Sequence, residues 1–246
     1  MKRLILTVKN VFLLFLIVIL GIVAYYTFMI GINDYSITNV FYKSKSDIDY
    51  KVYLYDNKYF EEEFLPKGRT YISSLINYID VDFNYKLKFD NLVTGDYVYY
   101  IRGTILADKV SGNGENAYWS KTYVLKQPEV IKYDKKEGFD IKDNVKIDYQ
   151  KYNKLLSSFK NAYGLSIDGK FKVEFVIESN NSTDEISQRM PVKTIASLNI
   201  PLTQKVIDLS IDLDNVDETN SFSEKIKIND NLHLAFCIVA GVLENS

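Results

Sequence analysis

The pattern that decides the fold is IDVDFNYKLKF, residues 79–89. Apolar residues stand at every second position, and charged or amide residues stand between them. Successive side chains of a β-strand point to opposite faces, so this segment has one apolar face and one polar face. A strand of this kind needs a core on one side and water on the other, which is typical of an antiparallel sheet.

Strand patterns recur along most of the chain. The other candidate strands are residues 48–54, 97–107, 117–125, 139–149, 171–177, 192–200, 206–213 and 222–228. A Ser-Gly-Asn-Gly loop at residues 111–114 tolerates positive φ, and it predicts that residues 97–107 pair with residues 117–125. We therefore predict a mainly β fold, an antiparallel β-sandwich over residues 47–228. If there are two subdomains, their boundary falls near residues 127–138.

One segment, residues 149–163, has the period of a helix instead. Its apolar positions follow the spacing i, i+3, i+4, i+7 and i+11, which describes one helical face: Tyr152, Leu155, Leu156, Phe159 and Tyr163. Asp148 can cap the first turn, and Gly164 can end the helix in the left-handed conformation. The sequence thus predicts a single amphipathic helix among the strands.

The N-terminal part contains 22 residues without a charge, residues 11–32, preceded by Lys2, Arg3 and Lys9. A helix of that length spans about 33 Å, enough for a hydrocarbon core of about 30 Å. The basic residues in front predict that residues 1–10 stay in the cytoplasm and that residues 33–46 link the span to an exterior domain. A cleaved signal peptide is the alternative, but its apolar part is shorter and ends in small residues.

The last segment, residues 229–246, contains the apolar run LHLAFCIVAGVL. At about 12 residues it is short of the roughly 17 that a span requires. It is a final core strand, an interfacial segment or a second membrane helix that is cut short, and its lack of alternation favours the last of these.

Charge argues against two classes of partner. The chain has 30 basic and 32 acidic residues, and three of the basic ones precede the apolar run. The exterior part therefore carries about −5, which argues against nucleic acid and against a polybasic lipid-binding patch. The single Cys237 excludes an internal disulfide.

Catalytic motifs are missing from the sequence. The only histidine, His233, lies in the apolar tail with Cys237, so neither a nucleophile–histidine pair nor a four-ligand zinc site can be assembled in the usual way. The acidic residues Asp208, Asp212, Asp214 and Asp217 do not follow the calcium-loop spacing. Two carboxylates that meet in space could still form a glycosidase site, although nothing favours it. We predict no enzymatic activity, no cofactor and no metal.

Aromatic residues offer one candidate binding platform. Its members are Tyr97, Tyr99, Tyr118, Trp119 and Tyr123. Such a platform would suit a protein or a carbohydrate polymer, but aromatic residues also stabilise sheets through cross-strand pairs and core burial. Because side chains alternate along a strand, only part of this cluster can share one exposed face.

Two segments resemble a known family. YWSKTYVL at residues 118–125 and VKIDYQKYNKLLSSFKNAYGLSIDGKFKVEF at residues 145–175 resemble domain-of-unknown-function family 5305 of bacteria and archaea. The resemblance implies an N-terminal membrane helix, an exported β-rich region and usually a second helix after it. Some relatives lie beside a signal peptidase gene, and no catalytic residues are established for the family.

These observations lead to two functional hypotheses. The first is a single-pass protein of the cell membrane whose exterior β-rich region binds a protein or a cell-wall polymer. The alternative is an accessory subunit of a membrane enzyme such as an export signal peptidase. The sequence determines neither the ligand nor the oligomeric state.

Overall fold

The computed structural model describes residues 2–33, 35–109, 118–214 and 219–227. The chain divides into two compact units, Met1–Asn39 with Ser223–Ser246, and Val40–Phe222. The prediction of a mainly β, antiparallel fold is confirmed. The predicted loop at residues 111–114 and the predicted apolar tail at residues 229–246 lie outside the described residues, as do His233 and Cys237.

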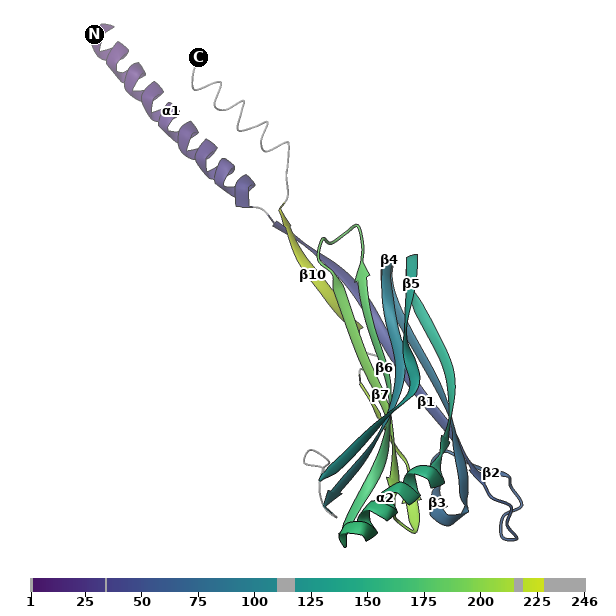
Figure 1. The fold of residues 1–246 in the computed structure, drawn as a ribbon. Helices are drawn as coiled ribbons and strands as arrows, with labels where there is room; N and C mark the ends of the chain where they lie inside the picture. Colours follow the sequence, from purple (N-terminus) through teal and green to yellow (C-terminus); the bar gives the residue numbers. More distant parts are fainter. Residues whose placement is uncertain (1, 34, 110–117, 215–218, 228–246) are drawn as a thin grey trace. The chain divides into compact units, whose positions relative to one another are not determined.

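The elements follow one another in a simple order (Figure 1). They are α1 (Lys2–Asn33), β1 (Tyr35–Leu54), β2 (Phe64–Pro66), β3 (Thr70–Ile72), the 3₁₀ turn η1 (Ser73–Leu75), β4 (Ile76–Lys109), β5 (Trp119–Asp148), α2 (Tyr149–Tyr163), β6 (Ile167–Ser182), β7 (Met190–Leu202), β8 (Val206–Asp208), β9 (Ser210–Leu213) and β10 (Thr219–Lys227). The main sheet has the order β10-β1-β4-β6-β7-β9, with β2 on β1 and β5 on β4, and β3 pairs with β8 separately.

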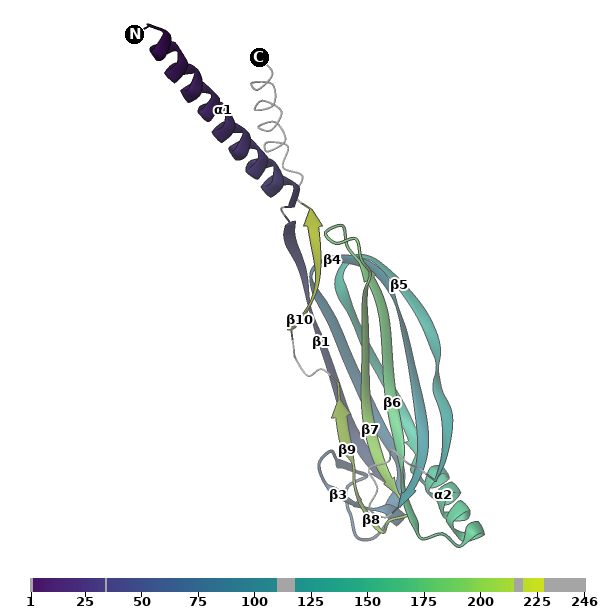
Figure 2. The same cartoon turned by 90° about the vertical axis from the view of Figure 1, so that its left-hand side faces the viewer.

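Strand β4 organises the Val40–Phe222 unit. One of its edges pairs with β5 along almost its whole length. Its other edge is shared, because the first half pairs with β1 and the second half pairs with β6. The long strands β4 and β5 arch over at one end of the unit and run back, while α2 lies at the opposite end (Figure 2).

The arch brings two layers of the same sheet face to face. One layer holds β1 and the first half of β4, and the other holds β6, β7 and the second half of β4. Phe83 of the first layer stacks on Phe175 of the second, with ring centroids 4.5 Å apart. Ser44 of β1 lies 3.1 Å from the hydroxyl of Thr194 of β7. The alternating apolar residues of the sequence therefore fill the space between the layers.

Residues 90–96 carry turn signals in the sequence, but they form the arch of a continuous strand. The ladder between β4 and β5 changes register between Lys88 and Val93 and again before Gly95. A Cβ on Gly95 would lie 2.2 Å from the carbonyl oxygen of Asn180, so the neighbouring strand approaches too closely for a side chain. Gly and Asp thus mark an irregularity inside the strand rather than a hairpin turn.

Two other segments differ from the sequence interpretation. Residues 127–138, the suggested subdomain boundary, lie inside β5. Residues 35–46, treated as part of a linker, form the first half of β1. Ser44 and Ser46 are buried there, and polar residues on a partly buried strand imitate the composition of a linker.

Helix α2 has the predicted bounds. The Asp148 side chain accepts a hydrogen bond from the backbone N–H of Lys151, and Gly164 ends the helix with φ 61°. The ring of Tyr152 stacks on Phe171 at 3.8 Å, and Leu156 is fully buried. The predicted apolar face therefore covers the sheet as far as Phe159, whereas its last member, Tyr163, is exposed.

Helix α1 includes the uncharged run of the sequence. The structure describes its side chains from residue 10 to residue 26. Over the described residues, no helix combines the length and the apolar character that a membrane crossing requires.

Candidate functional site

The predicted aromatic platform is divided between the core and the surface. Tyr97 and Tyr99 point into the core, where Tyr97 stacks on Phe139 at 3.9 Å and Tyr99 lies 6.0 Å from Phe83. Burial raises the pKa of both phenols, and a neighbouring carboxylate adds to the effect. These two residues are structural.

The other three platform residues lie at the end of the unit that carries α2. Trp119 stacks on Phe159 of α2 at 4.7 Å, and Tyr123 meets Tyr152 edge-on at 5.3 Å. Tyr118 is exposed. The structure adds Tyr163, which is exposed and continues the row from Phe159 at 5.1 Å. The helical spacing of Phe159 and Tyr163 was visible in the sequence, but the contact of Phe159 with Trp119 was not.

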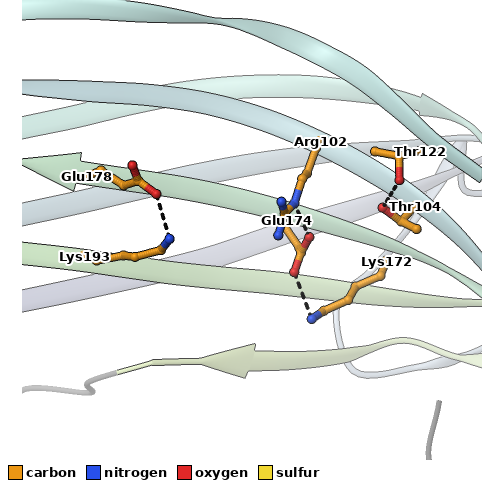
Figure 3. Close-up of polar contacts among 7 residues, drawn as sticks. All are labelled: Arg102, Thr104, Thr122, Lys172, Glu174, Glu178 and Lys193. Atoms are coloured by element: carbon orange, nitrogen blue, oxygen red, sulfur yellow. Dashed lines mark hydrogen bonds and ion pairs between the residues drawn. The ribbon is translucent and has the colours of Figure 1, made fainter. Parts of the chain in front are cut away.

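The outer face of β4 and β6 carries an ion-pair cluster around one buried carboxylate (Figure 3). Arg102 Nε lies 2.5 Å from one carboxylate oxygen of Glu174, and Lys172 Nζ lies 3.0 Å from the other. The Glu174 side chain is only 10% exposed, whereas that of Arg102 is 41% exposed. A second ion pair lies on the same face, between Lys193 and Glu178 at 2.7 Å, and the side chains of both residues are exposed to solvent.

Two opposing effects act on the carboxyl group of Glu174. Burial raises its pKa, but the hydrogen bonds and positive charges of Arg102 and Lys172 outweigh this, so that the pKa is lower than usual. The same hydrogen bond raises the pKa of Arg102. Because the ionised carboxylate is held more tightly in the folded state, this group stabilises the fold above its unfolded pKa, and the contribution disappears as the pH falls through the folded pKa.

We expect Glu174→Gln to lower the free energy of unfolding at pH 7 by about 1–3 kcal/mol, since charge-assisted hydrogen bonds to a buried group are lost. The difference from the unchanged protein should shrink as the pH falls through the lowered pKa of the folded-state carboxyl, where the unchanged protein becomes protonated. Urea unfolding between pH 3 and pH 7 measures both effects. Glu178→Gln is the control, because its exposed pair contributes less than about 1 kcal/mol; equal losses in the two variants would contradict the argument.

On the outer face of β1 and the first half of β4, positive and negative side chains occupy different stretches of the strands. Lys43 lies opposite Lys88, and Lys45 lies opposite Lys86. All four side chains are exposed, and we call them the lysine rows. Further along the same face, Asp49 lies opposite Asp82.

The acidic part of this face is a depression of about 560 Å³. Its polar lining is Asp47, Asp49, Asp82, Asn84, Lys142, Asp143 and Asn144. The Asn144 amide donates to Asp80 and to Asp82, at 2.9 Å each, and Lys126 pairs with Asp143. Among the described residues, no three of His, Cys, Asp and Glu are arranged to hold a metal ion.

No protein-family model, curated protein or solved structure matches this chain. The resemblance to family 5305 therefore stays a prediction, and the function has to be argued from the chain itself.

Two of the acidic residues considered for calcium, Asp208 and Asp212, have side-chain partners in the structure. Asp208 accepts a hydrogen bond from Thr70 at 2.6 Å, across the ladder of β3 and β8. Asp212 accepts one from Asn199 at 2.7 Å, next to the ladder of β7 and β9. Asp217 lies outside the described residues. These contacts hold short edge strands in place.

Proposed function

We propose that the protein is a membrane-tethered binding module that works outside the cytoplasm without catalysis. Helix α1 is the observation that carries this proposal. Its large apolar side chains between residues 11 and 26 are each 45–67% exposed. Soluble proteins rarely leave so many adjacent apolar side chains uncovered, so this surface requires an apolar partner.

A lipid bilayer is the partner that fits the whole sequence around this helix. The uncharged run continues to residue 32, and 22 helical residues reach about 33 Å. A helix satisfies its own backbone hydrogen bonds, as hydrocarbon demands. Lys2, Arg3 and Lys9 in front of the run favour a cytoplasmic N-terminus, which would leave the β-rich unit on the other side.

A binding role agrees with what the β-rich unit offers to a partner. Its two outer faces carry charged side chains in regular rows, and many of these form ion pairs. The rows stand on long strands with a well-packed core beneath them, so they form rigid and extended surfaces. Such surfaces suit a polymer or a protein better than a small substrate, which usually binds in a concave apolar pocket.

Membrane extraction tests the anchor. The full-length protein should stay in the membrane pellet after carbonate treatment, and the variant with Leu20→Lys and Ile22→Lys should move to the supernatant. Each lysine near the centre of a span costs about 2.5–3.5 kcal/mol. The control places the same charges on exposed valines of β5, with Val124→Lys and Val130→Lys, and should stay in the pellet.

Orientation is tested on intact cells. Added protease should digest the β-rich unit while a cytoplasmic marker survives. Release of the unchanged protein by carbonate, or full protection from the protease in intact cells, would contradict the proposal.

A further inference from the structure

We propose that the lysine rows and the apolar notch beside them bind a linear phosphodiester polymer with an uncharged carbon skeleton. This inference rests on the proposed function and names the class of partner. The four residues, Lys43, Lys45, Lys86 and Lys88, come from two strands that the ladder places side by side.

The pairing register brings four lysines together on one face. Like charges directly opposite each other on neighbouring strands are destabilising, and two such pairs follow one another here. The exterior part of the chain is negative as a whole, so this patch stands out from its surroundings. An anionic partner would relieve the repulsion.

The two lysines of the outermost row, Lys43 and Lys88, help to line an apolar notch of about 190 Å³. Its lining is Phe41, Tyr42, Lys43, Lys88, Phe89, Asp90 and Thr219. Phe41 is 45% exposed. The Asp90 carboxylate is engaged by the backbone N–H of Phe41 at 3.0 Å. Two cations at the rim of an apolar surface match a ligand in which charged and uncharged groups alternate.

The ion pairs of Lys86 and Lys88 are exposed to solvent. Lys88 pairs with Glu137 at 3.1 Å, and Lys86 lies 4.0 Å from Asp140. The two lysines and their two acidic partners each have side chains that are about 60% exposed. Exposed ion pairs of this kind contribute about 0–1 kcal/mol, so a polymer with many charges can replace them.

The residue type favours phosphate over carboxylate. The rows contain only lysine, which acts as a compact point charge, whereas arginine is preferred where a planar carboxylate is held by two parallel hydrogen bonds.

A polymer also fits better than a lipid headgroup. Lys43 lies eight residues after the first residue of β1, about 27 Å along the strand. A headgroup reaches it only if β1 lies along the membrane surface, while a polymer reaches it in any orientation.

Titration calorimetry of the full-length protein in neutral detergent tests the proposal, with poly(glycerol phosphate) as the probe. The variant with Lys43→Glu and Lys88→Glu should bind at least about 10-fold more weakly at low salt, and the slope of log affinity against log salt should fall by about 1 or more. The control, Lys51→Glu with Lys146→Glu, makes the same charge change further along this face and should bind like the unchanged protein.

The notch is tested with Phe41→Ala. This variant should lose affinity for poly(glycerol phosphate) but not for inorganic polyphosphate, which has no carbon skeleton. An equal loss with both polymers would contradict the role of the notch.

Three outcomes would overturn the proposal. The first is unchanged binding of poly(glycerol phosphate) by the variant with Lys43→Glu and Lys88→Glu. The second is tighter binding of an oligothymidylate than of poly(glycerol phosphate). The third is that phosphatidylglycerol in reconstituted vesicles protects the lysines from acetylation by an amine-reactive reagent. None of these measurements depends on carbonate extraction, so failure of the polymer inference is distinguishable from failure of the anchor.

Discussion

Replacing Gly138 by alanine should lower the free energy of unfolding by about 3–5 kcal/mol, because backbone strain and a steric collision act together. Gly138 has φ 141°, a conformation that residues with a side chain rarely adopt. It lies opposite Lys88 where β5 follows the arch of β4, and a Cβ would stand 2.0 Å from the carbonyl oxygen of Leu87. Backbone atoms cannot rotate away, so the ladder itself would have to move.

Urea unfolding followed by the fluorescence of Trp119, the only tryptophan, measures this effect. Gly164→Ala is the matched control, since Gly164 also has positive φ, at 61°, but a Cβ there meets nothing within 4 Å. That change should cost only about 1–2 kcal/mol of left-handed strain. A loss at Gly138 no larger than at Gly164 would show that the close approach of β5 to β4 does not limit the fold.

Replacing Phe83 by alanine should cost about 3–5 kcal/mol, because a large cavity would open between the two layers. Phe83 is fully buried, and its ring stacks on Phe175 of the opposite layer at 4.5 Å. Its ring centroid also lies 6.0 Å from that of Tyr99. Because Phe83 belongs to the first half of β4 and Tyr99 to the second half, this contact joins the two halves. The same unfolding measurement applies. If the alanine variant does not fold, the milder change Phe83→Leu, which should cost less stability, is measured in its place.

Tyr78→Ala is the control for Phe83. Tyr78 belongs to the same strand and stacks on Tyr53 at 4.5 Å, but this pair lies on the outer face and is partly exposed. Its loss should cost no more than about 1.5 kcal/mol. A double-mutant cycle of Phe83 with Phe175 should also give a coupling energy of about 0.5–1.5 kcal/mol; no coupling would contradict the face-to-face packing of the layers.

Local pattern was sufficient for the elements that depend on neighbours in sequence. The alternation in residues 79–89 predicted which side chains of β4 are buried, and the observed burial follows it residue by residue. Asp148 and Gly164 predicted both ends of α2. A strand face and a helix cap are set by geometry within a few residues, so the sequence contains them directly.

The candidate sites depended on contacts that no local pattern records. Tyr99 and Trp119 looked alike in the sequence, yet one is buried between the layers and the other packs on α2. The lysines at positions 43, 45, 86 and 88 form two rows only because β1 and β4 pair in one register. Whole-chain charge argued against a polybasic lipid-binding patch but could not reveal the lysine rows, since it averages over faces that the fold separates.

The sequence by itself determined the strand period, the amphipathic helix and the uncharged N-terminal run, since each is a property of consecutive residues. Only the tertiary structure decided that β4 and β5 are continuous and arch over, because Gly95 and Gly138 sit where neighbouring backbones come too close for a Cβ. The register of β1 on β4 decided which charges of these two strands share a face. Pairing between residues far apart in the chain is a matter of packing, and a one-residue shift of register would have placed those charges elsewhere.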